Sequence, residues 1–353
     1  MLMRSTLLAL AAVTLTPFSL EAHDGLLAQN AVAPPDTASV TQNVKMGGGT
    51  HQFKSVAGWC EIPTSAGAVL GATHGGIVVD KAGLIYFSTD TDRSIMVYSP
   101  EGKYLRSFDP KFSGCHGLAI HETNGEQFIY AAHLKGGQVV KFNLDGTPVL
   151  TIPYPAESGK YTKAGEYKVT GVAVGPNGDI YAADGYGKKW IHRYSADGKY
   201  VSSFGGPDPD LKNPTKELLS NPHGISLDTR GPQPLLLVAD REKSRLVHFD
   251  LEGKFVAVVI ENLRRPCSMS IRNGEVAIAE LQGRVTILDK DNKEVAHLGD
   301  NPNKKEWANF KVPTTDWKDG IFTAPHGIGY DAAGNLFVMD WNQSGRVSKL
   351  QKL

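Results

Sequence analysis

The sequence predicts an all-β fold, a six-bladed β-propeller, from three observations. One unit recurs along the chain: a Gly-apolar-x-apolar-Asp strand, a glycine turn, a strand ending in Ala-Asp, an apolar strand and an Asp-Gly-Lys turn. Its runs alternate apolar and polar residues, as half-buried strands do, and no long stretch has helical periodicity. Finally, 38 of the 353 residues are glycine. This content is well above the ~7% of an average protein and predicts many tight turns.

The most complete copy of the unit spans residues 169–200. Five further copies begin with first strands at 75–80, 116–121, 223–228, 267–272 and 326–331. Starts that lie roughly 40 to 60 residues apart, with hairpin signals inside each copy, favour four-stranded propeller blades over a solenoid. A β-sandwich or a jelly roll is the structural alternative, and the sixfold register argues against both.

The last copy ends at its third strand, near residues 346–350, so the ring lacks one outer strand. Residues 53–62 precede the first copy. We expect them to supply this strand and close the ring, which would leave no open sheet edge. The propeller is therefore expected to be a single domain over residues 51–353.

The amino-terminal residues predict export. Residues 1–22 combine a positive start at Arg4, an apolar centre and a small residue, Ala22, at the end. This is the pattern of a secretory signal peptide, and its apolar centre is too short to span a bilayer. Residues 23–50 are rich in Ala, Pro, Thr, Gln and Gly and predict a flexible leader. We expect a secreted or periplasmic protein with no membrane span.

Charge and cysteine content exclude other classes of protein. The 37 basic and 37 acidic side chains cancel to zero, which removes the electrostatic footprint of a nucleic-acid binder. The three cysteines, Cys60, Cys115 and Cys267, allow at most one disulfide bond. We expect the protein to act as a monomer.

Three histidines share one position of the repeat. Counting back five residues from the end of each first strand gives six equivalent positions: Gly75, His116, Thr170, His223, Cys267 and His326. First strands line the channel of a propeller, so these residues should form a ring at one mouth. The histidines fall in alternate blades and should converge on the axis. Three neutral imidazoles with a vacant fourth position are the ligands of a catalytic divalent metal, with zinc the first candidate. A polar channel lining that tolerates water is the alternative.

Three more residues are candidates near this ring. Cys267 could add a thiolate ligand, although a lone cysteine more often serves as a small buried hydrophobe. His74 is one residue out of register, next to Gly75. His133 ends a second strand, where four of the six copies have Asp or Glu. A carboxylate at that position can hydrogen-bond the backbone of a neighbouring turn. His133 could instead support a metal ligand or act as an acid or base.

The motifs resemble two known groups of proteins. Pro-x-Gly-Ile-x-x-Asp, Gly-Asn-Leu-Phe-Val-x-Asp and Ala-Asp-Arg-Glu-x-x-Arg-Leu look like NHL repeats over about residues 66–353. Among NHL-type propellers, the chain is similar to the peptidyl-α-hydroxyglycine α-amidating lyases, whose zinc is held by three channel histidines. The matching segments here are Cys-His-Gly-Leu at 115–118, Pro-His-Gly-Ile at 222–225 and Pro-His-Gly-Ile at 325–328. By this resemblance, Tyr186 in Asp-Gly-Tyr is the catalytic base, and Arg241 in Ala-Asp-Arg-Glu is an active-site arginine.

The chain also departs from the lyase pattern. A second active-site arginine of the lyases corresponds to Thr89, with Arg93 only nearby. The methionine and aspartate that flank the last zinc histidine are Ala324 and Gly327, and a disulfide cysteine is Gly187. The metal ligands and the tyrosine are thus kept, while part of the substrate clamp is changed. This implies related chemistry on another substrate, or a metal-binding propeller that has lost the reaction.

Three functions follow as hypotheses. The first is a secreted, zinc-dependent lyase that acts on a small-molecule or peptide substrate at the channel mouth. The second is a non-catalytic module that binds a protein, peptide or glycan through the loops of one face. The third is a calcium-dependent lactonase, which the imidazole-rich ring disfavours because calcium prefers oxygen ligands. A structural calcium ion in addition to the zinc stays open.

Overall fold

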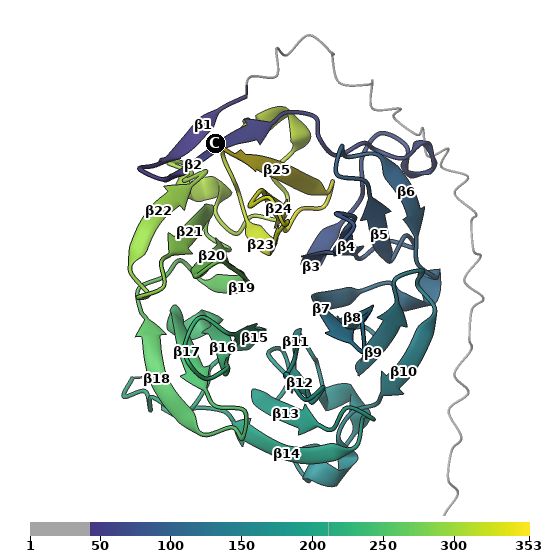
Figure 1. The fold of residues 1–353 in the computed structure, drawn as a ribbon, viewed down its shortest axis with the longest axis vertical. Coiled ribbons are helices and arrows are strands. Elements are labelled where there is room, and N and C mark those ends of the chain that lie inside the picture. Colours follow the sequence, from purple (N-terminus) through teal and green to yellow (C-terminus); the bar gives the residue numbers. More distant parts are fainter. Residues whose placement is uncertain (1–42, 211) are drawn as a thin grey trace, which may run out of the picture. The chain divides into compact units, whose positions relative to one another are not determined.

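The computed structural model describes residues 43–210 and 212–353. Within them, six antiparallel sheets are arranged radially around a central channel, as Figure 1 shows. Five sheets have four strands and the sixth has five. The predicted six-bladed β-propeller is therefore confirmed. The expected signal peptide and most of the expected leader lie outside the described residues.

The blades follow one another in chain order. Blade one contains β3 (Thr73–Val79), β4 (Ile85–Thr89), β5 (Ile95–Tyr98) and β6 (Tyr104–Ser107). Blade two contains β7 (Cys115–Thr123), β8 (Glu126–His133), β9 (Gln138–Asn143) and β10 (Pro148–Ile152). Blade three contains β11 (Gly171–Val174), β12 (Ile180–Ala183), β13 (Trp190–Tyr194) and β14 (Tyr200–Gly205).

The second half of the ring repeats this arrangement. Blade four contains β15 (Pro222–Asp228), β16 (Leu235–Asp240), β17 (Arg245–Phe249) and β18 (Phe255–Ile260). Blade five contains β19 (Pro266–Arg272), β20 (Glu275–Glu280), β21 (Arg284–Leu288) and β22 (Glu294–Leu298). Blade six contains β23 (Pro325–Tyr330), β24 (Leu336–Asp340), β25 (Arg346–Lys352), β2 (His51–Val56) and β1 (Lys45–Gly48).

Ring closure follows the prediction in kind but not in its boundaries. The closing strand is β2, which pairs with β25 through Phe53 and Lys352; it covers residues 51–56, not 53–62. β1 then adds a fifth strand by pairing with β2. The expected leader therefore ends too late, at residue 50. Its last residues form β1, which pairs with β2 as a hairpin, and β2 in turn pairs with the distant β25.

The core is divided among the blade interfaces. Six apolar clusters each join residues of two neighbouring blades. For example, Tyr181 of β12 and Val238 of β16 are fully buried in the same cluster. The apolar residues of each strand thus pack against the next blade, because propeller sheets stack face to face. This packing holds the first strands at fixed positions around the channel.

Tight turns join the strands, and helices are short. At residues 195–198, for instance, the Gly198 N–H donates to the Ser195 carbonyl with a φ of 85°, a conformation that favours glycine. The helical segments of the described residues are 3-10 turns at Thr64–Ala66, Pro110–Phe112, Ala156–Ser158, Ala164–Glu166, Arg241–Lys243, Lys304–Glu306 and Thr314–Asp316. None of the helices in this part of the chain is long and apolar enough to cross a membrane.

Candidate metal centre

The six ring residues predicted from the repeat lie around one cavity. A channel cavity of about 50 Å³ is lined by Gly75, His116, Thr170, His223, Cys267 and His326. Each residue belongs to, or directly precedes, the innermost strand of its blade. Residues at the same position of the repeat therefore lie at the same depth along the channel axis.

The three predicted histidines converge. The ring centroids of His116, His223 and His326 are 4.7–4.8 Å apart in every pair. All three side chains are buried, with 1–2% of their surface exposed. Burial lowers the pKa of each imidazole well below its usual value, so all three are neutral at pH 7 and can donate a lone pair to a metal.

The orientation of these imidazoles is set by the next first strand around the ring. In each case the Nδ1–H donates to the backbone carbonyl of the neighbouring ring residue: His116 to Thr170 at 2.6 Å, His223 to Cys267 at 2.9 Å and His326 to Gly75 at 3.0 Å. This bond leaves Nε2 with its lone pair. The Nε2 atoms of His116 and His326 are buried and have no hydrogen-bond partner among the described residues. Orphaned lone pairs of this kind fit a divalent metal.

The glycine after each histidine makes these bonds feasible. A Cβ added at Gly117 would lie 2.6 Å from the Thr170 oxygen, and one at Gly224 would lie 2.3 Å from the Cys267 oxygen. These are the carbonyls that accept from the histidines. A side chain at either position would push the accepting carbonyl away. The His-Gly pair is therefore a structural requirement of the ring.

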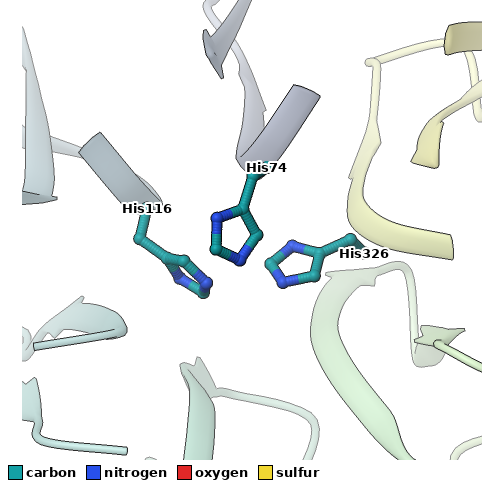
Figure 2. A group of neighbouring side chains, drawn as sticks. All are labelled: His74, His116 and His326. Carbon is teal, nitrogen blue, oxygen red and sulfur yellow. The ribbon is translucent and has the colours of Figure 1, made fainter. Parts of the chain in front are cut away.

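His74 joins the cluster, although the repeat places it one residue out of register. Figure 2 shows its ring turned toward those of His116 and His326. The ring centroids are 4.6 Å and 4.8 Å away, and the three residues each offer a nitrogen within 4.8 Å of the others. His74 is thus a neighbour of the predicted ligands.

A bulge explains why counting from the first strand missed His74. Thr73 pairs with Thr89 and Ile77 with Phe87, so three residues of β3 stand opposite Ser88 alone. The equivalent bulges in β15 and β23 contain fewer residues. Counting instead from the residue paired with the end of the second strand puts His74 in the same place as His223 and His326. The position of His74 relative to the end of the second strand is a property of the sequence, but it can be recognised only once the strand pairing is known.

Cys267 also offers a ligand atom at the centre. Its sulfur and one nitrogen each of His223 and His326 lie within 4.8 Å of one another. All three cysteines are free, so none of them forms a disulfide. Burial raises the pKa of the Cys267 thiol to about 11, which keeps it protonated at neutral pH without a bound metal.

Tyr186 contacts the histidine cluster, and Arg241 contacts Tyr186. The Tyr186 hydroxyl is 2.9 Å from His223 Nε2 and 3.5 Å from His74 Nε2. Arg241 Nη1 donates to the same hydroxyl at 3.2 Å. Burial raises the pKa of Tyr186, and the Arg241 charge acts in the opposite direction. In the absence of a metal, loss of solvent outweighs the nearby cation, and the pKa of Tyr186 lies above its usual value.

His133 does not contact the cluster. Its Nε2 is 3.1 Å from the Ser113 carbonyl and its Nδ1 is 3.2 Å from Gln138 Nε2. Its ring packs against Phe112. Nδ1 is thus used by Gln138 at the start of β9, and Nε2 holds the turn that leads into His116. This is the role that carboxylates have at the same position of other blades.

Thr89 and Arg93, at and near the position of the second lyase arginine, make other contacts. Thr89 is buried, and its hydroxyl is 2.8 Å from that of Thr91. Arg93 donates through Nη2 to the Leu70 carbonyl at 2.6 Å. Arg93 is thus committed to a backbone carbonyl of the loop before β3.

Comparison with known proteins agrees with this architecture. No protein-family model matches the chain. The chain is 32% identical to peptidyl-alpha-hydroxyglycine alpha-amidating lyase 1 of Drosophila melanogaster over 142 residues, which are 38% of this chain and 25% of that protein. It is 26% identical to NHL repeat-containing protein 3 of Mus musculus over 208 residues, 56% of each. The chain thus spans about a quarter and about half of these relatives.

Solved structures share the fold. Streptogramin B lyase aligns with a TM-score of 0.53 at 17% identity, covering 80% of this chain and 94% of that one. A gluconolactonase from Xanthomonas campestris aligns with a TM-score of 0.56 at 14% identity, covering 88% and 99%. At such identities the likeness concerns the fold alone. Together with the relatives, it shows a β-propeller that is distantly similar to an amidating lyase and an NHL-repeat protein.

Proposed function

We propose that this protein is an exported, metal-dependent propeller lyase, related in chemistry to the amidating lyases and altered in its substrate clamp. The observation that carries the proposal is the convergence of neutral imidazoles beneath a tyrosine hydroxyl that also contacts an arginine. The substrate would be a small molecule or a peptide terminus at the channel mouth. Export rests on the signal-peptide pattern of residues 1–22.

The metal would be held by His116, His223 and His326, with zinc as the first candidate because its preferred ligands include imidazole nitrogens. When bound, such an ion supplies Lewis-acid polarisation of a substrate oxygen. The protein itself fixes the ligands before binding, because each Nδ1 is tied to a backbone carbonyl. His223 Nε2, which accepts from the Tyr186 hydroxyl at 2.9 Å, would exchange that contact for the metal.

Tyr186 is the proposed base. A substrate of the amidating-lyase type carries a hydroxyl and an amide nitrogen on one carbon. Removal of the hydroxyl proton by Tyr186 would let the carbon–nitrogen bond break: the carbon becomes a carbonyl, and the proton taken up by Tyr186 passes to the nitrogen, which leaves as the amide. The Arg241 cation, 3.2 Å from the phenol oxygen, favours the phenolate that accepts the proton.

Arg241 is proposed mainly to position Tyr186. Its Nε donates to Glu242, its Nη1 to Tyr186 and, with the Asn221 amide turned to donate to Gly185, its Nη2 to Asn221. Its remaining N–H groups could bind a substrate carboxylate. Because Thr89 and Arg93 supply no second cation beside Tyr186, we infer that the substrate does not require two arginines to bind it.

Metal analysis of the exported protein tests the proposal. We expect about one equivalent of zinc or another divalent ion per chain, lost in His116→Ala, His223→Ala and His326→Ala proteins. An N-acyl-α-hydroxyglycine serves as the activity probe, with the primary amide and glyoxylate as products. Tyr186→Phe should retain the metal and lose at least a hundredfold in turnover, the usual effect of removing a general base.

Two outcomes would overturn parts of this function. The first is a purified protein that contains no metal, together with histidine variants whose affinity for added zinc equals that of the parent. This result would leave the non-catalytic binding module as the better hypothesis. Full metal binding with unchanged turnover in Tyr186→Phe would remove the tyrosine from the mechanism. His297→Ala is the matched control, because that imidazole lies on the outer strand β22.

A further inference from the structure

His74 has the surroundings of a metal ligand. Its ring lies 4.6 Å from that of His116 and 4.8 Å from that of His326, the two imidazoles whose Nε2 atoms are buried without a partner. One nitrogen from each of the three residues lies within 4.8 Å of the other two. His223, by contrast, already accepts from the Tyr186 hydroxyl through Nε2. His74 is therefore as well placed as His223 to share an ion with His116 and His326.

A carboxylate lies behind His74. Asp90 Oδ2 is 3.3 Å from His74 Nδ1, on the side of the ring away from Nε2. Figure 2 shows the His74 ring at the centre of the group, between those of His116 and His326. The other ring histidines use neutral backbone carbonyls for this second contact. A carboxylate in that position orients an imidazole and makes its free nitrogen a stronger donor to a metal.

We propose that His74 is a fourth protein ligand of the metal and that Asp90 positions it, an inference that rests on the proposed metal-dependent function. The ion would then be held by His74, His116, His223 and His326, a set with four nitrogen donors. Such a set closes the tetrahedral positions that a three-histidine site leaves open to water. With His74 bound, the ion would be less accessible to external ligands than in a three-histidine site; His74 is the most exposed of the four.

Metal titration tests this ligand set without any activity assay. Metal-free proteins are titrated with Zn²⁺ against a chromophoric chelator, and Co²⁺-loaded proteins are examined by visible absorption. We expect His74→Ala to weaken Zn²⁺ binding at least tenfold. Asp90→Asn, which retains the imidazole, should weaken it by about tenfold, within the range seen when a residue behind a ligand is changed. His297→Ala should bind like the parent.

Azide provides the second readout. It should leave the Co²⁺ spectrum of the parent unchanged, because four imidazoles fill the tetrahedral positions, and it should alter the spectrum of His74→Ala at the vacated position. Equal Zn²⁺ affinity and the same azide response in His74→Ala and the parent would overturn the inference. If His74→Ala does not fold, unchanged affinity in Asp90→Asn would overturn the role of Asp90 and its support for His74.

Failure of this inference can be told apart from failure of the proposed function. If His116→Ala, His223→Ala and His326→Ala lose the metal and His74→Ala does not, only the fourth ligand is wrong. If none of the four variants affects the metal, the whole centre is wrong.

Discussion

At the scale of the residue, the site depends on pairs of neighbours in the chain. Each ring histidine needs the glycine that follows it, because the carbonyl that orients the imidazole occupies the space of a Cβ. For His223 the accepting carbonyl belongs to Cys267, on the next blade. The orientation of His223 and the packing of neighbouring blades are thus linked through a single carbonyl oxygen.

Gly224→Ala tests this link. Its Cβ would meet the Cys267 oxygen at 2.3 Å, so the carbonyl must move and the His223 bond must lengthen. We expect a loss of about 1–3 kcal/mol in the free energy of unfolding, as for other overpacked sites, and weaker Zn²⁺ binding. Urea denaturation and zinc titration measure the two effects. Gly165→Ala, at a glycine with open space around it, is the control; equal behaviour of both variants would contradict the prediction.

The buried imidazoles should make the metal-free protein sensitive to acid. Burial lowers the pKa of His192 to about 3 and those of His116, His223 and His326 well below 6.5. The unfolded chain therefore binds more protons, and stability present above pH ~6.5 is lost as the pH falls toward the folded-state values, by up to about 1.4 kcal/mol per pH unit for each histidine. Thermal unfolding between pH 7.5 and 5 measures this slope. The slope should be shallower in His116→Gln. An identical slope in this variant and the parent would show that the buried His116 does not contribute to acid sensitivity.

At the scale of the element, the ends of the second strands hold the segments that enter the first strands. The Asp184 carboxylate accepts from the Lys168 N–H, the Asp240 carboxylate accepts from Asn221, and the Asp340 carboxylate accepts from Ala324. Each accepted N–H lies two residues before a ring position. These buried contacts set the height at which the ring residue meets the axis. They also explain why such carboxylates recur without binding a metal.

Asp240→Ala measures the importance of this contact. Asp240 also pairs with Arg245 at 3.0 Å, and both side chains are almost fully buried. The variant leaves the Arg245 charge unpaired and two N–H groups without an acceptor, so we expect a loss of about 3–5 kcal/mol. Differential scanning calorimetry provides the measurement. Asp92→Ala, at an exposed position, should have little effect, and a comparable small change in Asp240→Ala would count against the proposed role.

At the scale of the whole molecule, stability depends on a closed ring. β2 pairs with β25, and Phe53 of β2 and Leu350 of β25 are fully buried in the cluster between blades five and six. Without β2, blade six would expose an edge and this cluster would open to water. The amino-terminal segment of the described residues therefore completes the fold that holds the last histidine, His326.

Truncation tests ring closure. A chain that begins at Ala57 lacks β1 and β2, and we expect it to bind a hydrophobic dye and to lose its cooperative thermal transition. A chain that begins at Asn43 retains every described residue and is the control. Equal melting temperatures for the two chains would show that the closing strand is dispensable.

The sequence alone was sufficient to predict the six blades and the ring of histidines. Strand periodicity, glycine turns and the repeat are local properties, so they can be read without knowing which strands pair. The convergence of His116, His223 and His326 followed because equivalent residues of a closed ring must lie at one height. The second-strand carboxylates were likewise correctly interpreted as contacts to turns.

The tertiary structure decided what depends on strand pairing and on neighbours distant in the chain. His74 reaches the centre because β3 has a larger bulge, and a bulge is defined by the partner strand. The hydroxyl of Tyr186 meets His223, 37 residues away, and Arg241, 55 residues away. His133 lies outside the cluster because its nitrogens are used by Ser113 and Gln138. Periodicity gives the positions of residues along their own strands, whereas contacts between blades depend on how the strands pair and pack in three dimensions.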